Sequence, residues 1–461
     1  MKEWLIPAAG IVSILIFIYY VLVVISYWAV IVNAFFKLKT NMKVVNANID
    51  FESESLGRIS ILVPAYNEAD TILNSVQSLL QQEYGEYEII VINDGSQDDT
   101  LDNLIRHFDL KMIPIHYQHQ LECKTIKGVY MDLKRPGRLI VVDKENGGKA
   151  DSLNAGINFS RNEYICCIDA DCILEPQALK KIVRVFARKK ETIAVGGMVK
   201  AVNGCHVKDG KVVQIDLPKT FIERMQVVEY LRAFLSSRFT WNKNNGSLII
   251  SGAFGMFDKK AVLSVGGYKT GLGEDMELVV RLQEYYRKNR IPYSISLASD
   301  AVCWTQVPTR YKDLQTQRIR WHKGLIESLL QHKTMLLNPR YGFVGMAAFP
   351  LQFFVEMLGP IIEVVGYVLL FVIAYYYGIT SAALWIFAMA YLYGVFQTII
   401  AVVFEHRSYN IYRTKTNTLQ LIVACFIEPL FYRPITVLWR VRAFLTFKSR
   451  NRWGQIQRQK F

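Results

Sequence analysis

The chain has 461 residues, of which 51% are hydrophobic and 13% are aromatic, and its mean hydropathy is +0.16. This composition excludes an ordinary soluble protein, and the length suffices for one sizeable domain together with membrane segments. Lysine and arginine outnumber aspartate and glutamate by 54 to 40, for a formal net charge of +14. Basic residues gather beside apolar runs, and zinc-finger, helix-turn-helix and aromatic RNA-binding signatures are absent from the sequence. We therefore expect membrane lipids, and no nucleic acid, as partners.

The first apolar run covers residues 4–36, where no side chain is charged. It is longer than the ~20 residues that a helix needs to cross a bilayer. Lys37, Lys39 and Lys43 follow it, and by the positive-inside rule they place its carboxyl end in the cytoplasm. The sequence therefore predicts a transmembrane anchor in residues 1–40.

Residues 50–340 have the character of a soluble, cytosolic α/β domain. Continuous apolar strands alternate with segments of helical periodicity such as Ala69–Gln82, which is typical of a mostly parallel sheet covered by helices on both faces. The expected strands are Ile59–Pro64, Glu88–Asn93, Leu139–Asp143 and Ile165–Ile168. The seven cysteines form no C-x-x-C pair, which indicates reduced thiols rather than a disulfide framework.

The segment Phe221–Arg238 is amphipathic. Its apolar stripe consists of Phe221, Met225, Val228, Leu231 and Leu235. Such a helix either packs on its own domain or lies on the membrane surface, and the sequence leaves both alternatives open.

Residues 341–440 are apolar again. The runs are Phe343–Tyr377, Ala382–Phe404 and Leu419–Leu438. Glu356, Glu363 and Glu428 lie inside these runs, which favours interfacial, re-entrant or pore-facing helices for part of the region. The basic tail, residues 441–461, should stay in the cytoplasm, so we expect two full crossings after the soluble domain, together with interfacial helices.

Two carboxylates follow the strand Ile165–Ile168 directly. Asp169 and Asp171 flank Ala170, and alternate residues of an extended chain point to the same side. Ionised carboxylates are costly to bury without compensation, and ligands of α/β sheets bind at the carboxyl ends of strands. The pair is therefore a candidate site for one hard metal ion, although an ordinary strand-to-turn junction also explains it.

Five further polar clusters lie in the same domain. Tyr66 and Glu68 follow the first strand, where a nucleotide base and ribose could rest, and Asp94 follows the second, where it could accept from a base N–H. Lys149 opens a helix after a glycine turn, a position that suits a diphosphate. The remaining clusters are Gly273-Glu274-Asp275 and Gln317-Arg318-Ile319-Arg320-Trp321. For each cluster alone, a turn, a helix cap or a solvated helix face is the simpler explanation.

The order and wording of these clusters resemble the inverting, membrane-bound glycosyltransferases of family 2, which include cellulose, chitin, hyaluronan and poly-N-acetylglucosamine synthases. The resemblance covers nearly the whole chain and implies a nucleotide-sugar-binding domain of the glycosyltransferase A type. It implies that Asp94 contacts uracil and that Lys149 lies on the phosphate side of the nucleotide. It also implies that Asp169 and Asp171 bind the sugar diphosphate through Mg²⁺ or Mn²⁺.

The same resemblance implies roles on the acceptor side. Asp275, beside Glu274, corresponds to the general base. The motif Q-x-x-R-W, which holds the leaving diphosphate and the acceptor terminus in the family, is matched by Gln317, Arg320 and Trp321. Phe254 in Ser251-Gly-Ala-Phe-Gly255 corresponds to an acceptor-lining residue by a weaker match, because this segment departs from the cellulose-synthase wording.

We therefore expect a UDP-sugar-dependent, inverting hexosyltransferase at the cytoplasmic membrane. It would extend a β-linked polysaccharide of N-acetylglucosamine or glucose processively. The alternative is a non-processive enzyme that adds one sugar to a lipid carrier or another membrane acceptor. A catalytically inactive nucleotide-sugar-binding scaffold is disfavoured because both paired aspartates and Asp275 are present. Expected partners are the UDP-sugar, the nascent glycan or lipid acceptor, membrane lipids and separate export or accessory proteins.

Overall fold

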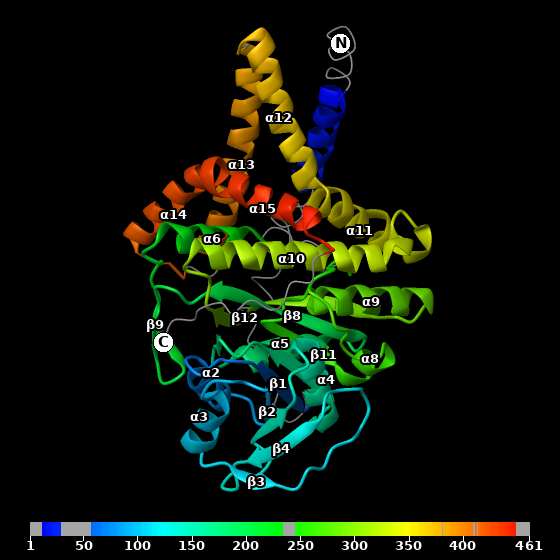
Figure 1. The fold of residues 1–461 in the computed structure, drawn as a ribbon, viewed down its shortest axis with the longest axis vertical. Coiled ribbons are helices and arrows are strands. Elements are labelled where there is room, and N and C mark those ends of the chain that lie inside the picture. Colours follow the sequence, from blue (N-terminus) through cyan, green and yellow to red (C-terminus); the bar gives the residue numbers. More distant parts are fainter. Residues whose placement is uncertain are drawn as a thin grey trace.

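The computed structural model of the protein describes most of the chain, namely residues 12–28, 57–233, 245–379, 381–408, 411–412 and 414–448. The ends of the expected anchor, the carboxyl end of the amphipathic segment and most of the basic tail lie outside these residues. Figure 1 shows three tiers: the α/β domain, a middle tier of helices, and an upright group of helices furthest from the sheet.

The α/β domain is built on one large sheet, which has ten strands within the described residues. Its centre, β5-β2-β1-β6, is parallel, whereas β11 runs antiparallel between β6 and β8. In sheet order the strands are β3 (Lys111–Ile113), β4 (Ile126–Met131), β5 (Leu139–Lys144), β2 (Tyr87–Asn93), β1 (Ile59–Ala65), β6 (Tyr164–Ile168), β11 (Phe254–Asp258), β8 (Thr192–Ala201), β12 (Ser294–Thr305) and β7 (Cys172–Leu174). A separate hairpin is formed by β9 (His206–Lys208) and β10 (Lys211–Gln214).

The expected strands are all present, and the predicted parallel arrangement holds for the centre of the sheet. The antiparallel strands at its sides escaped prediction for two reasons. The strands β7 and β11 are mostly buried, and a buried apolar run does not indicate the direction of its strand. The strands β3 and β4 are partly exposed and mix polar with apolar residues. Since the central strands are parallel, their carboxyl ends meet at one edge of the sheet.

Helices cover both faces of the sheet. On one face lie α2 (Ile72–Leu80), α3 (Thr100–His107) and α5 (Ala178–Arg188), and on the other α4 (Lys149–Phe159), α8 (Lys259–Ser264) and α9 (Glu274–Lys288). Alternation along β1 supplies both cores: Ile61 and Val63 pack in the first, and Leu62 packs in the second.

The middle tier consists of α6 (Phe221–Arg232) and α10 (Tyr311–Gln331), which lie between the sheet and the C-terminal helices (Figure 1). The Thr220 hydroxyl caps α6 by accepting a hydrogen bond from the Glu223 amide. Helix α6 packs against β8 on one side and against α13 and α14 on the other. Met225, Val228 and Leu231 of its apolar stripe are therefore buried between the domain and the C-terminal helices, whereas Phe221 is exposed. This agrees with the alternative in which the helix packs on its own domain, and contact of the segment with the membrane surface stays a prediction.

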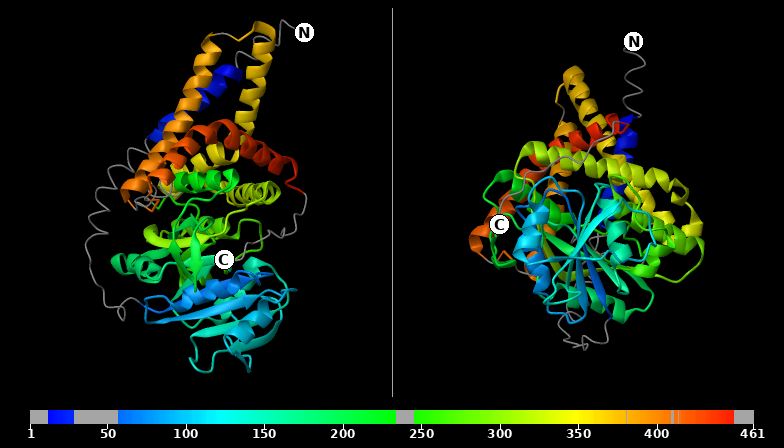
Figure 2. Two further views of the ribbon diagram at one scale, coloured as in Figure 1. Left: turned by 90° about the vertical axis from the view of Figure 1, so that its left-hand side faces the viewer. Right: turned by 60° about the horizontal axis from the view of Figure 1, so that its bottom comes forward.

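The C-terminal region begins with short helical segments that connect α10 to α12. They are Lys333–Met335, Pro339–Tyr341, Val344–Ala348, α11 (Phe349–Leu351) and Gln352–Met357. Helices α12 (Gly359–Tyr377) and α13 (Ser381–Ser408) then rise side by side away from the sheet, with the helix Val12–Trp28 beside them (Figure 2). Tyr27 of this N-terminal helix donates a hydrogen bond to Glu356 Oε1 at 2.9 Å.

The last two helices run across the base of this upright pair (Figure 1). They are α14 (Lys415–Ile427) and α15 (Arg433–Leu445), joined by the π-helical turn Glu428–Tyr432. Within the described residues, three stretches are long and apolar enough to cross a membrane: Gly359–Tyr376, Phe387–Arg407 and Lys415–Leu445. Because only the first two stand upright, the arrangement agrees with two crossings plus interfacial helices, and the number of crossings stays a prediction.

Candidate active site

Carboxylates from two elements converge on one lysine at the carboxyl edge of the sheet. Lys149 Nζ, at the start of α4, lies 2.5 Å from Asp169 Oδ1 and 3.5 Å from Glu274 Oε1. Burial lowers the pKa of Lys149, but the charges of Asp169, Glu274 and Asp275 outweigh burial and raise it overall. The lysine is therefore a permanent cation within an acidic cluster.

Glu274 and Asp275 begin α9 and differ in their surroundings. Glu274 is buried, and this burial raises the pKa of its carboxyl group, while the charge of Lys149 acts in the opposite direction. Asp275 is half-buried; its Oδ2 accepts from the Gly252 amide at 3.0 Å and its Oδ1 from the Met276 amide at 2.8 Å. The side chains of Lys149, Glu274 and Asp275 line a small cleft together with Gly252. Asp275 thus presents a fixed carboxylate to this cleft.

A close contact between glycines brings the Q-x-x-R-W segment of α10 to the same cluster. A Cβ atom on Gly324 would lie 2.8 Å from the Cα of Gly273. The backbone of α10 therefore touches the backbone of Gly273, the residue that precedes Glu274. The charge of Arg320 lowers the pKa of Glu274, which places the guanidinium within electrostatic reach. Gln317 is buried, whereas 43% of Trp321 is exposed. The structure therefore joins the two motifs that the sequence separates.

Asp94 lies at the end of β2, and hydrogen-bond donors surround its carboxylate. The donors are Lys144 Nζ at 2.6 Å, Gly147 N at 2.9 Å, Gly148 N at 2.8 Å and Asn146 Nδ2 at 3.2 Å. A carboxylate has about four acceptor positions, so this set fills them. Lys144 is fully buried and also lies 2.6 Å from Asp151 Oδ1. Asp94 thereby holds the glycine turn that leads into Lys149.

The loop after β1 carries Tyr66 and Glu68. Tyr66 is exposed at the edge of the sheet, and Glu68 Oε2 accepts from the Thr71 hydroxyl at 2.8 Å. Asn67 Oδ1 accepts from the Gln97 amide at 2.8 Å, which ties this loop to the loop after β2. The predicted base and ribose region is therefore formed by two loops that are fastened to each other.

Asp169 and Asp171 differ in exposure. One third of the Asp169 side chain is exposed, whereas Asp171 is 3% exposed and its Oδ1 accepts from the Thr305 hydroxyl at 3.4 Å. Throughout the described ranges, no group of three or more His, Cys, Asp or Glu side chains could hold a metal ion. Two carboxylates do fit Mg²⁺ or Mn²⁺, because such ions commonly complete their shell with water and substrate phosphates.

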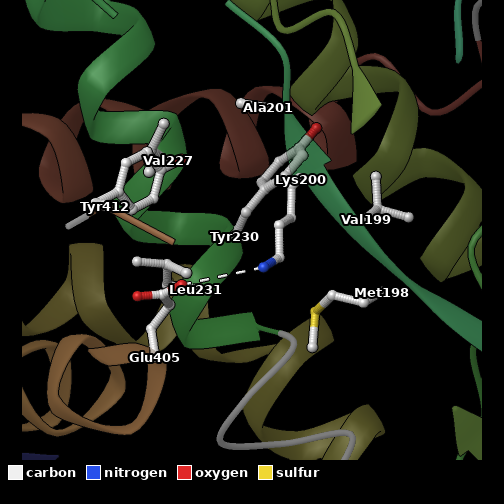
Figure 3. Close-up of a pocket in the computed structure, with 9 residues that line it drawn as sticks. All are labelled: Met198, Val199, Lys200, Ala201, Val227, Tyr230, Leu231, Glu405 and Tyr412. Carbon is white, nitrogen blue, oxygen red and sulfur yellow. Dashed lines mark ion pairs between the residues drawn. The ribbon is translucent and has the colours of Figure 1, made fainter. Parts of the chain in front are cut away.

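A second, apolar cavity lies away from this cluster, between β8, α6 and the end of α13. Figure 3 shows Lys200 of β8 extending toward Glu405 of α13. The Lys200 Nζ lies 4.0 Å from Glu405 Oε1. Burial lowers the pKa of Lys200 to about 8, although the charge of Glu405 acts in the opposite direction. This cavity lies at the junction of the α/β domain and the upright helices, and it contains none of the predicted site residues.

Sequence reasoning misplaced one residue of the site and missed others. Phe254 has no exposed surface, and its ring packs on Gly197, so it belongs to the core and the prediction that it lines an acceptor site is wrong. Lys144 escaped notice, although a charged residue at the end of a buried strand is a usable signal. The contact of Gly252 with Asp275 has no counterpart in a local pattern, because 23 positions separate them.

The fold is an α/β domain with three carboxylates around one lysine at the carboxyl edge of its sheet, and comparison with known proteins gives the family. Residues 57–324, more than half of the chain, match the family described as glycosyltransferase like family 2. The chain therefore belongs to this glycosyltransferase family.

Two relatives are named poly-beta-1,6-N-acetyl-D-glucosamine synthase. The protein from Staphylococcus epidermidis strain RP62A is 28% identical over 307 residues, which are 66% of this chain and 63% of that protein. The protein from Staphylococcus aureus strain MSSA476 is 28% identical over 306 residues, with the same two shares. The chain thus spans less than two thirds of the length of these relatives.

A solved structure shares the fold. It is a mannosyltransferase from Pyrobaculum calidifontis in complex with GDP-Man and Mn²⁺, with a TM-score of 0.51 and 17% sequence identity. The match covers 89% of this chain and 98% of that one. The fold of the described α/β domain is therefore of the glycosyltransferase A type, with several apolar helices near the C-terminus.

Proposed function

We propose that the protein transfers N-acetylglucosamine from its UDP-sugar to a growing β-linked polysaccharide at the cytoplasmic membrane. Transfer is processive and inverts the anomeric configuration. The two synthase relatives support the sugar and the polymer product, and glucose is the next candidate donor. The observation that carries the proposal is the convergence of Asp169, Glu274 and Asp275 on Lys149 at the carboxyl edge of the sheet.

On the donor side, the proposal assigns the diphosphate to Lys149 and Asp169 and the nucleoside to the loops of Tyr66, Glu68 and Asp94. The permanent positive charge of Lys149 suits the two phosphate groups. Mg²⁺ or Mn²⁺, when bound at Asp169 and Asp171, supplies further positive charge to the diphosphate.

Asp275 acts as the general base in one direct displacement. The acceptor hydroxyl oxygen attacks C1 of the donor sugar, and its proton passes to Asp275. The bond between C1 and the diphosphate oxygen breaks, and its electron pair leaves with UDP. Two backbone amides hold the Asp275 carboxylate in place, which supports a base of fixed orientation. Glu274 keeps Lys149 oriented, and Arg320 adds positive charge for the departing diphosphate.

On the acceptor side, the exposed Trp321 offers an aromatic face to the terminal sugar, and Gln317 offers its amide. The anchor, α12 and α13 cross the membrane, while α14 and α15 lie in its interface. Two crossings after the cytosolic domain keep the basic tail in the cytoplasm, which agrees with the positive-inside rule.

The test is turnover by the purified protein in detergent or lipid. It is incubated with a panel of UDP-sugars and Mg²⁺ or Mn²⁺, and UDP release and product length are followed. We expect long polymer from UDP-N-acetylglucosamine. A product with one added sugar on a lipid would instead support the non-processive alternative, and UDP binding without release from any donor would support a scaffold.

Asp275→Asn tests the proposed base. We expect turnover to fall by about 10²-fold or more, because general base catalysis contributes about that factor, while UDP affinity stays unchanged. Asp102→Asn is the matched control, since Asp102 also lies in the first turn of a helix, α3. Equal activity of Asp275→Asn and wild type would remove Asp275 from the mechanism.

A further inference from the structure

Arg318 occupies the second position of the Gln317–Trp321 segment and is 2% exposed. Its Nη1 donates to Gln317 Oε1 at 2.6 Å, and its guanidinium carbon lies 4.2 Å from the centre of the Trp321 ring. One buried side chain therefore contacts two of the three motif residues to which the proposed function assigns the acceptor and the diphosphate.

The contact with Gln317 determines which way its amide faces. A guanidinium only donates hydrogen bonds, so the Gln317 amide must turn its oxygen to Arg318. Its NH₂ group is consequently directed away from Arg318. Without this contact, the amide could rotate and present an acceptor where the acceptor sugar needs a donor.

The contact with Trp321 determines the position of an exposed ring. A planar guanidinium stacks on an aromatic face with an attraction that increases when the pair is desolvated. Arg318 is buried on its side of the ring, whereas Trp321 is 43% exposed. Arg318 therefore supports the ring from the protein side and leaves other surface of the ring accessible.

Two other elements hold the guanidinium itself. Arg318 Nη2 donates to Glu229 Oε2 of α6 at 2.6 Å and to the Tyr432 hydroxyl at 3.4 Å. Tyr432, which ends the π-helical turn between α14 and α15, donates in turn to Glu229 Oε2 at 2.7 Å. The charge of Glu229 keeps the buried arginine protonated. The residues that hold Arg318 therefore lie outside the sheet, on α6 and on the turn between α14 and α15.

We propose that Arg318 is a positioning residue that sets Gln317 and Trp321 for the acceptor and makes their placement depend on α6 and the α14–α15 turn. The inference rests on the proposed function, because it takes these two residues as the acceptor site. A shift of α6 or of the turn would move the acceptor contacts and leave the donor contacts of Lys149 in place.

Arg318→Lys is the main test. Lysine keeps the positive charge, but it has no planar guanidinium that could stack on Trp321 and donate to Gln317 at the same time. We expect the KM for UDP-N-acetylglucosamine to stay within about twofold of wild type. The affinity of the UDP-bound protein for a short β-linked N-acetylglucosamine oligomer should fall about tenfold, as expected for one lost charge-assisted hydrogen bond. Polymer should become shorter, and more UDP should be released without transfer. Tyr432→Phe, which removes only a hydroxyl, should change the same quantities less.

Arg281→Lys is the matched control. Arg281 is also buried and paired with a carboxylate, Glu277 at 2.8 Å, and its other hydrogen bonds go to the carbonyl oxygens of Val265 and Gly267, outside the motif. A merely structural role of Arg318 would lower thermal stability and donor and oligomer binding together, as in the control. Equal oligomer affinity and product length in wild type, Arg318→Lys and Tyr432→Phe would overturn the inference. Absence of turnover in the wild type, with the expected oligomer binding retained, would instead contradict the proposed function alone.

Discussion

At the scale of single residues, the structure gives Asp94 a different role from the one that the sequence predicts. The family resemblance assigns it to uracil, yet its carboxylate already accepts from Lys144, Asn146 and the amides of the glycine turn. A base N–H would have to displace one of these donors, at the expense of a charge-assisted or backbone hydrogen bond. Holding the turn before Lys149 is therefore a large part of what Asp94 contributes.

Asp94→Asn distinguishes the two roles. The asparagine amide replaces one acceptor oxygen with a donor, so the glycine turn loses support and Lys149 loses its position. We expect UDP and inorganic pyrophosphate, each with Mg²⁺, to lose affinity to a similar extent, about tenfold or more. Asp132→Asn is the control, because Asp132 is a buried carboxylate directly after β4 that binds Arg135 at 3.1 Å. Loss of UDP affinity with unchanged pyrophosphate affinity would establish the uracil contact instead.

Residue identity in the site could be predicted only where the signal is local. Asp169 and Asp171 could be predicted because two carboxylates end an apolar strand. Lys149 could be predicted because it follows two glycines. The buried Lys144 lies between Asp94 and Asp151, which are 50 and seven positions away in the chain. Lys144 meets Asp94 because β5 lies beside β2 in the sheet, and a single sequence does not contain this order of strands.

At the scale of elements, the packing of α10 on the start of α9 decides whether the two halves of the site meet. Gly324 and Gly273 allow backbone contact, which a side chain on either would prevent. In the middle of a helix glycine is unfavourable by about 1 kcal/mol relative to alanine, so its presence in α10 needs a reason of this kind.

Gly324→Ala should therefore destabilise the protein rather than stabilise it. Its Cβ would lie 2.8 Å from backbone atoms of Gly273, and overpacking of this kind costs about 1–3 kcal/mol. We also expect kcat to fall on the order of tenfold to a hundredfold, because Gln317, Arg320 and Trp321 move relative to Asp275. Thermal unfolding and steady-state turnover measure the two effects.

Gly366→Ala in α12 is the control for this substitution. A Cβ there would meet only Ile16 at 3.9 Å, an ordinary contact, so we expect unchanged or slightly higher stability. If Gly324→Ala behaves like Gly366→Ala in both assays, close packing of α10 on α9 is not required.

At the same scale, the four predicted strands and their parallel direction were predicted more accurately than the helix ends. Each of the four predicted strands begins and ends within one residue of the observed strand, because its apolar run has clear limits. These are the strands predicted to begin at Ile59, Glu88, Leu139 and Ile165. The predicted helix Ala69–Gln82 is shorter in the structure, Ile72–Leu80, since the loop after β1 is tied to its neighbour.

At the scale of the whole molecule, charged groups join the α/β domain to the helices above it. Glu428 is 1% exposed and pairs with Arg232 of α6 at 3.1 Å and with Arg433 at 2.8 Å. Lys200 of β8 approaches Glu405 of α13 in the cavity of Figure 3 and lies 5.9 Å from the centre of the Trp304 ring. These pairs place ionic interactions, which are orientation-dependent, where the two parts of the molecule meet.

Lys200 gives this junction a predictable pH dependence. Its pKa is about 8 in the folded protein, lowered from 10.5 by burial and partly restored by Glu405 and Glu175. Between these two values the unfolded chain binds more protons, so the free energy of unfolding rises with pH from about 8 to about 10.5. Below pH 8 both states are protonated and the dependence disappears. A tenfold difference in proton affinity corresponds to about 1.4 kcal/mol, so the total rise is on the order of 3 kcal/mol.

Lys200→Met removes the titrating group and should remove this rise. We expect the stability difference between wild type and Lys200→Met, followed by thermal unfolding in detergent, to be constant from pH 6 to about 7.5 (well below the folded pKa of about 8). Above that pH it should shift steadily in favour of the wild type. Lys312→Met, on the exposed start of α10, is the control and should leave the pH profile unchanged. Parallel profiles of wild type and Lys200→Met would mean that Lys200 keeps an ordinary pKa, and hence that water reaches the junction between the sheet and α13.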